Sequence, residues 1–121
     1  MINLTASEID ITGLTNPSTF QIGDTGSMVP TLQNGDTVLA VPTNELNIGD
    51  VGVYLHDVTN GVSTYFLHRV IDKKVENGVT YYQFKGDHSF WYDSISWTGL
   101  PSWFPASLVC YKVIGAIYKV N

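Results

Sequence analysis

The sequence of 121 residues contains a single cysteine, Cys110, and few basic residues. One cysteine cannot form a disulfide within the chain, and one thiolate cannot build a zinc site. Lysine and arginine together number 6 against 11 aspartates and glutamates, which gives a formal net charge of -5. Six scattered cations do not make a basic patch, so we expect no nucleic-acid partner.

Long apolar runs are also missing. The longest is far shorter than the ~18–20 residues that a transmembrane helix requires. Residues 1–21 lack the basic start and the continuous apolar stretch of a secretory signal. Charged residues make up only 14% of a chain that is 44% hydrophobic, which excludes an intrinsically disordered protein. At this length we predict one domain, residues 1–121, in which residues 1–24 form a polar N-terminal extension.

Helical periodicity is nearly absent, and β-branched and aromatic runs bounded by turn residues take its place. Asn60-Gly61 and Asn77-Gly78 are strong hairpin signals, and Gly115 indicates a bulge or bend in the last run. Residues 89–105 form a long irregular segment that carries all three tryptophans, and such loops are usually functional. We therefore predict an all-β domain of five to seven strands, with runs at 37–41, 51–55, 64–71, 79–85 and 109–120.

Ser27 lies in a loop whose neighbours restrict the backbone. Gly26 allows a ligand to approach the backbone closely, while Pro30 and the Gly35-Asp36 pair fix turns further along the chain. Ser27 is therefore expected to be held on a rigid, presented loop. On its own, a serine in such a loop is more often a turn former than a nucleophile, so the assignment depends on the rest of the chain.

Five short sequence blocks along the chain bear on whether Ser27 is a turn former or a nucleophile. They lie at 26–32 with 35–39 (GSMVPTL, GDTVL), 49–54 (GDVGVY), 67–71 (LHRVI), 84–87 (FKGD) with Asp93, and 113–117 (VIGAI). In order and spacing the blocks resemble the type I signal peptidase family over residues 25–118. The resemblance implies the partly open, barrel-like all-β fold of signal peptidase and LexA catalytic domains. It also implies serine endopeptidase activity.

The third block selects a subtype. Bacterial signal peptidases and LexA-type repressors carry a lysine there as general base, whereas this sequence has His68 before Arg69, which is similar to the archaeal and endoplasmic-reticulum branch. The resemblance implies that Ser27 is the nucleophile and His68 the base, with Asp87 and Asp93 as acidic candidates. Imidazole can take a serine proton near neutral pH, and a carboxylate on its other nitrogen fixes the tautomer.

Either aspartate fits the place beside His68. Asp87 follows a glycine in a tight turn, where its carboxylate readily binds local amides. Asp93 lies in the loop beyond and is freer to reach back toward the strand that carries His68. We therefore favour Asp93 as the partner of His68, and Asp87 then braces the site or pairs with Arg69.

The resemblance further implies an oxyanion site made by the Ser27 amide and the Thr25 hydroxyl two residues upstream. Gly26, Met28 and Pro30 are expected to border the bound substrate. The implied substrate is an extended peptide with small side chains before the cleaved bond, bound as an added strand. Neither a metal nor an organic cofactor is implied.

The sequence departs from the family in one respect, because family members normally carry an N-terminal transmembrane helix. We expect either a free-standing soluble or virion-associated relative, or a chain whose anchor has been removed. Trp91, Trp97 and Trp103 suit contact with a membrane interface or a protein partner, although a small satellite core beneath a long loop is the simpler interpretation. The alternative to an enzyme is a structural or interaction protein that retains the fold, and the reach between Ser27 and His68 distinguishes the two.

Overall fold

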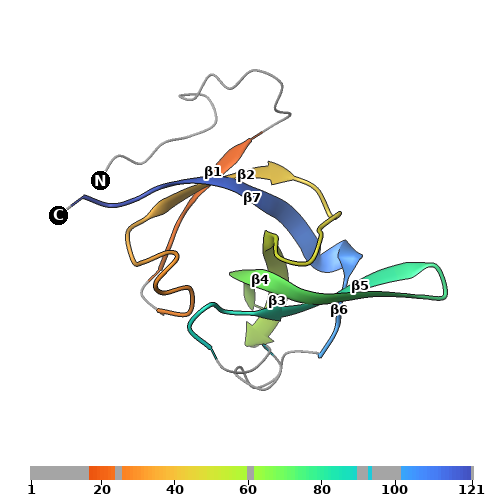
Figure 1. The fold of residues 1–121 in the computed structure, drawn as a ribbon. Coiled ribbons are helices and arrows are strands. Elements are labelled where there is room, and N and C mark those ends of the chain that lie inside the picture. Colours follow the sequence, from red (N-terminus) through yellow and green to blue (C-terminus); the bar gives the residue numbers. More distant parts are fainter. Residues whose placement is uncertain (1–16, 24–25, 60–61, 90–92, 94–101, 121) are drawn as a thin grey trace.

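Seven strands form one antiparallel sheet in the order β1-β2-β7-β3-β4-β5-β6 (Figure 1). The computed structural model describes residues 17–23, 26–59, 62–89, 93 and 102–120. The elements are β1 (Ser18–Gln21), β2 (Thr37–Pro42), β3 (Val51–Thr59), β4 (Val62–Glu76), β5 (Val79–Lys85), β6 (Phe104–Pro105), the 3-10 helix η2 (Ala106–Leu108) and β7 (Val109–Ile117). Within the described residues the sheet is not closed, because β1 and β6 end the order without pairing with each other. The all-β prediction is confirmed.

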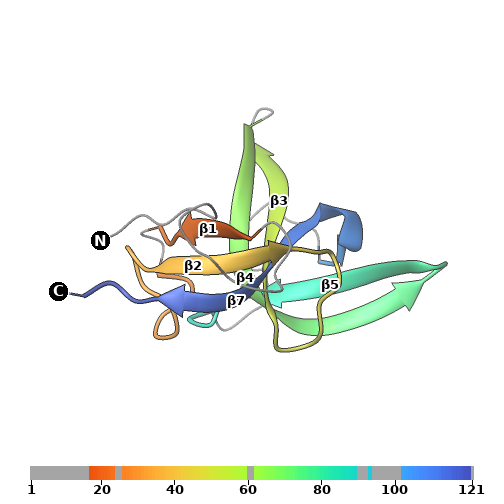
Figure 2. The same cartoon turned by 90° about the horizontal axis from the view of Figure 1, so that it is seen from above.

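The sheet bends so that two groups of strands face each other. Figure 1 shows β1, β2 and β7 on one side and β3 to β6 on the other. Figure 2 shows the β3–β4 and β4–β5 hairpins projecting in different directions from this body. β4 belongs to both hairpins, because its first part pairs with β3 and its second part with β5, and the change of partner falls at Arg69. His68, the residue before this change, therefore lies where the two hairpins meet.

The five runs predicted from the sequence correspond to β2, β3, β4, β5 and β7. β3 and β4 are longer than predicted because they pair with each other as far as Thr59 and Val62. Along β7 the pairing with β2 moves from Leu39↔Gly115 to Ala40↔Val113. The residue between, Ile114, is therefore the extra residue of a bulge directly beside Gly115, where the sequence indicates one.

The sequence does not predict β1 and β6. Residues 18–21 fall within the expected polar extension, yet they pair with β2 from Ser18↔Ala40 to Gln21↔Thr37. β6 falls within the expected irregular segment 89–105 and pairs Phe104 with Tyr82. Both strands are too short to show an alternating pattern, and the packing of one aromatic ring in each, Phe20 and Phe104, decides their position.

Two apolar clusters lie on opposite faces of β3 and β4. The first core contains Leu46, Tyr54, Val70, Tyr82, Phe84, Phe104 and Val109, and the second core contains Met28, Leu32 and Val38. Side chains alternate along a strand, so Phe66 packs on the first core and Leu67 on the second. His68 shares the face of Phe66, and the two rings lie 6.2 Å apart. The alternation therefore places the His68 imidazole beside the first core.

Phe84 tests the placement of the first core. Its ring is buried, with ring centroids 4.5 Å from Tyr54 and 5.6 Å from Phe104. Phe84→Ala should lower the free energy of unfolding by about 3–5 kcal/mol, because lost apolar burial and a new cavity add. Urea denaturation followed by tryptophan fluorescence measures this loss.

The matched control is Val75→Ala, which removes an exposed side chain near the tip of the β4–β5 hairpin. It should change the free energy of unfolding by less than about 1 kcal/mol. Similar losses in the two variants would contradict the placement of Phe84 in the core.

Candidate active site

Ser27 begins a turn whose backbone is fixed on both sides. Gly26 has a φ of 72°, in the left-handed region that favours glycine. Its carbonyl accepts the Val29 amide at 3.2 Å, which closes the turn around Ser27. The Ser27 carbonyl accepts the amide of His88, from the loop after β5, at 2.8 Å. The Ser27 side chain therefore projects from a backbone that two separate chain segments hold.

Ser27 and His68 come together although 41 residues separate them in the sequence. His68 Nε2 lies 3.1 Å from Ser27 Oγ, and His68 Nδ1 lies 2.6 Å from Asp93 Oδ2. His68 is 2% exposed and its contact with Asp93 is buried, whereas Ser27 is half-buried and its contact with His68 is partly buried. The three side chains thus stand in the order hydroxyl, imidazole, carboxylate, which is the order that general-base activation of a serine requires.

Asp93 is the acid that contacts His68, and it is buried beside the first core. Its Oδ2 accepts a second hydrogen bond, from the Tyr54 hydroxyl. Among the described residues, no donor reaches the other carboxylate oxygen, Oδ1. Burial, followed by the charge and the hydrogen bond of Asp93, raises the pKa of Tyr54 above its usual range, so the phenol remains a donor. Tyr54 lies within the second sequence block, but nothing in the sequence alone indicates that it meets Asp93.

Asp87 takes a different place from Asp93. Arg69 binds it with two parallel bonds, Nε to Oδ1 at 2.9 Å and Nη2 to Oδ2 at 2.8 Å. The Thr31 hydroxyl donates to the same Oδ2 at 2.6 Å. Asp87 therefore joins the turn that follows Ser27 to the residue that follows His68. The Arg69 hydrogen bonds are the main cause that holds the pKa of Asp87 below its usual value, and the Thr31 bond acts in the same direction.

Gly86 allows the loop after β5 to lie directly against Ser27. A Cβ atom at this position would approach the Ser27 carbonyl oxygen to 2.5 Å and the Ser27 Cβ to 3.1 Å. Lys85 holds the loop in place, because its Nζ donates to the carbonyls of Gly86 at 2.8 Å and Ser89 at 2.6 Å. The sequence offers the Gly86-Asp87 pair as a turn, but not its contact with Ser27.

The other residues that the sequence analysis expects at the site differ in burial. Thr25 lies outside the described residues. Met28 was expected to border the substrate, yet its side chain is buried in the second core. Its sulfur lies 3.5 Å from the Asp87 amide nitrogen. Gly26 is half-buried and Pro30 is exposed on the following turn.

The expected tryptophan loop falls largely outside the described part of the chain, which includes neither Trp91 nor Trp97. Trp103 is half-buried, and the Lys74 ammonium lies 4.5 Å from the centre of its ring. A cation over an indole face is a favourable contact. Trp103 therefore packs with the β4–β5 hairpin.

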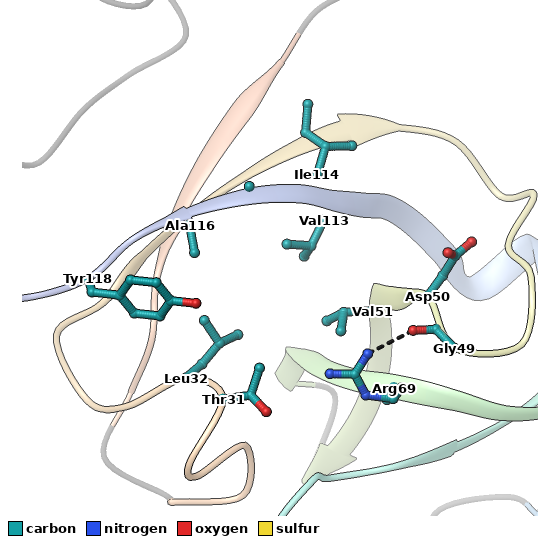
Figure 3. Close-up of a pocket in the computed structure, with 11 residues that line it drawn as sticks. Thr31, Leu32, Gly49, Asp50, Val51, Arg69, Val113, Ile114, Ala116 and Tyr118 are labelled. Carbon is teal, nitrogen blue, oxygen red and sulfur yellow. Dashed lines mark hydrogen bonds between the residues drawn. The ribbon is translucent and has the colours of Figure 1, made fainter.

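A cavity of about 300 Å³ lies between β7 and the start of β3 (Figure 3). Val51 and Val113 point into it, whereas Ile114 turns away. Arg69 lies at one side and donates from Nη1 to the Gly49 carbonyl at 2.8 Å. Ser27, His68 and Asp93 do not line this cavity. It is therefore separate from the hydroxyl–imidazole contact.

Within the described residues, no group of three or more histidines, cysteines, aspartates or glutamates could hold a metal ion. No helix in the described ranges is both long enough and apolar enough to cross a membrane. Cys110 is half-buried, and burial raises the pKa of its thiol.

The chain matches no family model, no curated protein and no solved structure.

The Asp87 contacts predict an acid dependence of stability. Because the pKa of Asp87 is lower in the folded protein than its ordinary value of 3.8, ionised Asp87 stabilises the fold above that pH. This contribution is lost as the pH falls from about 4 toward the folded-state pKa. Asp87→Asn should therefore lower the free energy of unfolding at neutral pH and flatten its decline between about pH 4 and pH 2.

Urea denaturation at a series of pH values measures both effects. Asp72→Asn is the matched control, because Asp72 is exposed on β4 and its carboxylate accepts the adjacent Lys73 amide. A decline of the same steepness in Asp87→Asn and in the parental protein would contradict the role of the Arg69 pair.

Proposed function

We propose that this chain is a serine endopeptidase of the signal-peptidase type, with Ser27 as nucleophile and His68 as general base. The observation that carries the proposal is the continuous series of contacts from Ser27 Oγ through His68 to Asp93. The five sequence blocks and the all-β sheet support it. The partly open, barrel-like fold of signal peptidase and LexA catalytic domains belongs to the same proposal.

The proposed reaction has two halves, formation of an ester to Ser27 and its hydrolysis, and Ser27, His68 and Asp93 act in both. His68 Nε2 takes the Ser27 proton while Oγ attacks the carbonyl carbon of the cleaved bond. His68 then gives this proton to the departing amine, and an ester to Ser27 remains. Water, activated by the same imidazole, hydrolyses the ester and restores Ser27. Asp93 keeps the Nδ1 proton directed toward itself, so that Nε2 is the acceptor throughout.

The oxyanion formed in these steps requires hydrogen-bond donors at fixed positions. The proposal assigns this role to the Ser27 amide and the Thr25 hydroxyl, as the family resemblance implies. Support comes from the turn itself, because Gly26 and the His88 amide fix the peptide groups on either side of Ser27. A backbone that does not reorganise during the reaction is what makes such donors effective.

The proposed substrate is an extended peptide that adds to one edge of β4. The Val70 amide donates to the Asp50 carbonyl at 2.8 Å, and the Val70 carbonyl accepts the Gly49 amide at 2.9 Å. Both groups of Val70 are thus directed toward the β3 side. Because backbone groups alternate in direction along a strand, those of Leu67 and Tyr65 face the opposite edge.

β5 pairs with β4 only from Arg69 onward, so no strand of the described residues pairs with the Leu67 edge. This edge directly precedes His68. A peptide bonded to Leu67 and Tyr65 would therefore carry its carbonyls toward the Ser27–His68 contact. Small side chains next to the cleaved bond suit the buried surroundings of His68. The site needs no metal and no organic cofactor in this mechanism.

A structural protein that retains the fold was the alternative. It would be favoured by a Ser27 hydroxyl out of reach of His68, and the 3.1 Å separation favours the enzyme instead.

The decisive experiment removes the nucleophile. A β-lactone probe, which acylates reactive serine hydroxyls, should label the parental protein on the peptide that contains Ser27. Ser27→Ala should abolish this label and lower cleavage of an alanine-containing peptide by about 10³-fold or more, with the melting temperature preserved. Mass spectrometry locates the label and chromatography measures cleavage.

Ser107→Ala is the control, because Ser107 is an exposed serine in η2, outside the proposed site. It should be labelled and should cleave as the parental protein does. Equal labelling and cleavage in Ser27→Ala, or no labelling of the parental protein, would contradict the proposal.

Gly86 gives a second test that leaves the three reacting side chains intact. A methyl group at this position would displace Ser27 relative to His68, because it would lie 2.5 Å from the Ser27 carbonyl oxygen. Misplacing a reacting group by about 1 Å costs on the order of 10²-fold in rate. Gly86→Ala should therefore lower kcat by roughly this factor.

Gly115→Ala is the control, because a Cβ there meets no atom within 4 Å. Its kcat should equal that of the parental protein. Unchanged peptide cleavage by Gly86→Ala would show that the packing of Gly86 against Ser27 has no part in catalysis.

A further inference from the structure

Tyr54 occupies an unusual position for a core tyrosine. Its side chain is 0% exposed, and its hydroxyl donates to the same Asp93 oxygen that His68 Nδ1 contacts. Its ring packs against Phe84, at a centroid distance of 4.5 Å, and Phe104, at 4.4 Å, and stacks on Phe66 at 5.3 Å. The direction of the hydroxyl is therefore fixed by aromatic packing.

We propose that Tyr54 is a positioning residue that acts on His68 through Asp93. This inference rests on the proposed peptidase function and extends the series to Ser27, His68, Asp93 and Tyr54. The Tyr54 hydroxyl holds the Asp93 carboxylate in the orientation that accepts the hydrogen bond from His68 Nδ1. It also takes part of the negative charge of the carboxylate.

The need for such a residue follows from the surroundings of Asp93. The carboxylate is buried, and among the described residues its Oδ1 accepts no hydrogen bond. Its hydrogen bonds from His68 and Tyr54 both fall on Oδ2. A carboxylate bound by the imidazole alone could rotate about its last bond and draw the imidazole with it. Two donors on one oxygen remove this freedom.

The second effect is on protonation. Of the described titratable groups, His68 and Tyr54 contact the Asp93 carboxylate directly. Because the Tyr54 hydroxyl draws negative charge from the carboxylate, it weakens the attraction between that carboxylate and a protonated His68. Loss of the hydroxyl should therefore favour the protonated imidazole and move its titration to higher pH.

Tyr82 provides a matched control in the same core. It is also buried, at 1% exposure, and its hydroxyl also makes hydrogen bonds, a partly buried one to the Asn44 carbonyl and a buried one from the Leu46 amide. Neither contact involves Asp93. Tyr82→Phe therefore removes a buried hydroxyl of the same kind without touching the proposed series.

The first measurement is kinetic. Tyr54→Phe should lower kcat about tenfold with little change in KM, whereas Tyr82→Phe should leave kcat within about twofold even where it lowers the melting temperature equally. In an Asp93→Asn background, Tyr54→Phe should have no further effect on kcat, because residues that act through one another are not additive. Equal kcat losses in Tyr54→Phe and Tyr82→Phe would overturn the proposal.

The second measurement does not depend on activity. The titration of the His68 imidazole is followed by NMR, with His68→Gln identifying its signals among the three histidines. Tyr54→Phe should move the midpoint to higher pH by roughly 0.5 to 1 unit, and Tyr82→Phe should not move it. Incorporation of 3-fluorotyrosine at position 54, a more acidic donor, should move the midpoint to lower pH. This variant tests the same proposal if Tyr54→Phe does not fold.

The two measurements separate the two proposals. A parental protein without Ser27-dependent cleavage overturns the peptidase function, while a shifted midpoint in Tyr54→Phe still supports the coupling of Tyr54 to His68. An unchanged midpoint in Tyr54→Phe overturns the inference about Tyr54 even in an active enzyme.

Discussion

The candidate site depends on a carboxylate buried beside aromatic rings. Asp93 lies at the edge of the first core, where an isolated charge would cost much free energy. The hydrogen bonds from His68 and Tyr54 reduce that cost, and their geometry follows from strands β3 and β4. The imidazole therefore has one stable orientation, and the Ser27 hydroxyl has to be brought to it. The remaining contacts of the site hold Ser27 beside the imidazole.

Those contacts converge on the turn after Gly26 from the loop that follows β5. Gly86 packs against Ser27, the His88 amide binds the Ser27 carbonyl, and Asp87 joins Thr31 to Arg69. Ser27 is thus aligned by backbone contacts and an ion pair that leave its hydroxyl directed at His68. The proposed reaction would benefit from this support, because misplacing a reacting group by about 1 Å costs on the order of 10²-fold in rate.

Sequence patterns carry much of the fold and of the site, with definite limits. Alternating runs predict β2 to β5 and β7, because half-buried strands have to alternate. Alternation does not predict β1 and β6, because tertiary packing of Phe20 and Phe104 decides the positions of these strands. The sequence supplies Ser27, His68 and both aspartates, but only the folded chain separates Asp93 from Asp87. Tyr54 resembles any other core tyrosine until the position of Asp93 is known.

The change of partner within β4 also constrains how this chain can vary. Successive side chains alternate, so inserting or deleting one residue ahead of position 68 would exchange the faces occupied by His68 and Arg69. The imidazole would turn toward the second core, and the guanidinium would be placed beside Asp93. A change of one residue in the length of β4 ahead of His68 is thus incompatible with the site. At the exposed Asn77-Gly78 turn no such parity applies. Related chains that keep the site should therefore differ in length at the hairpin tip and not within the strand.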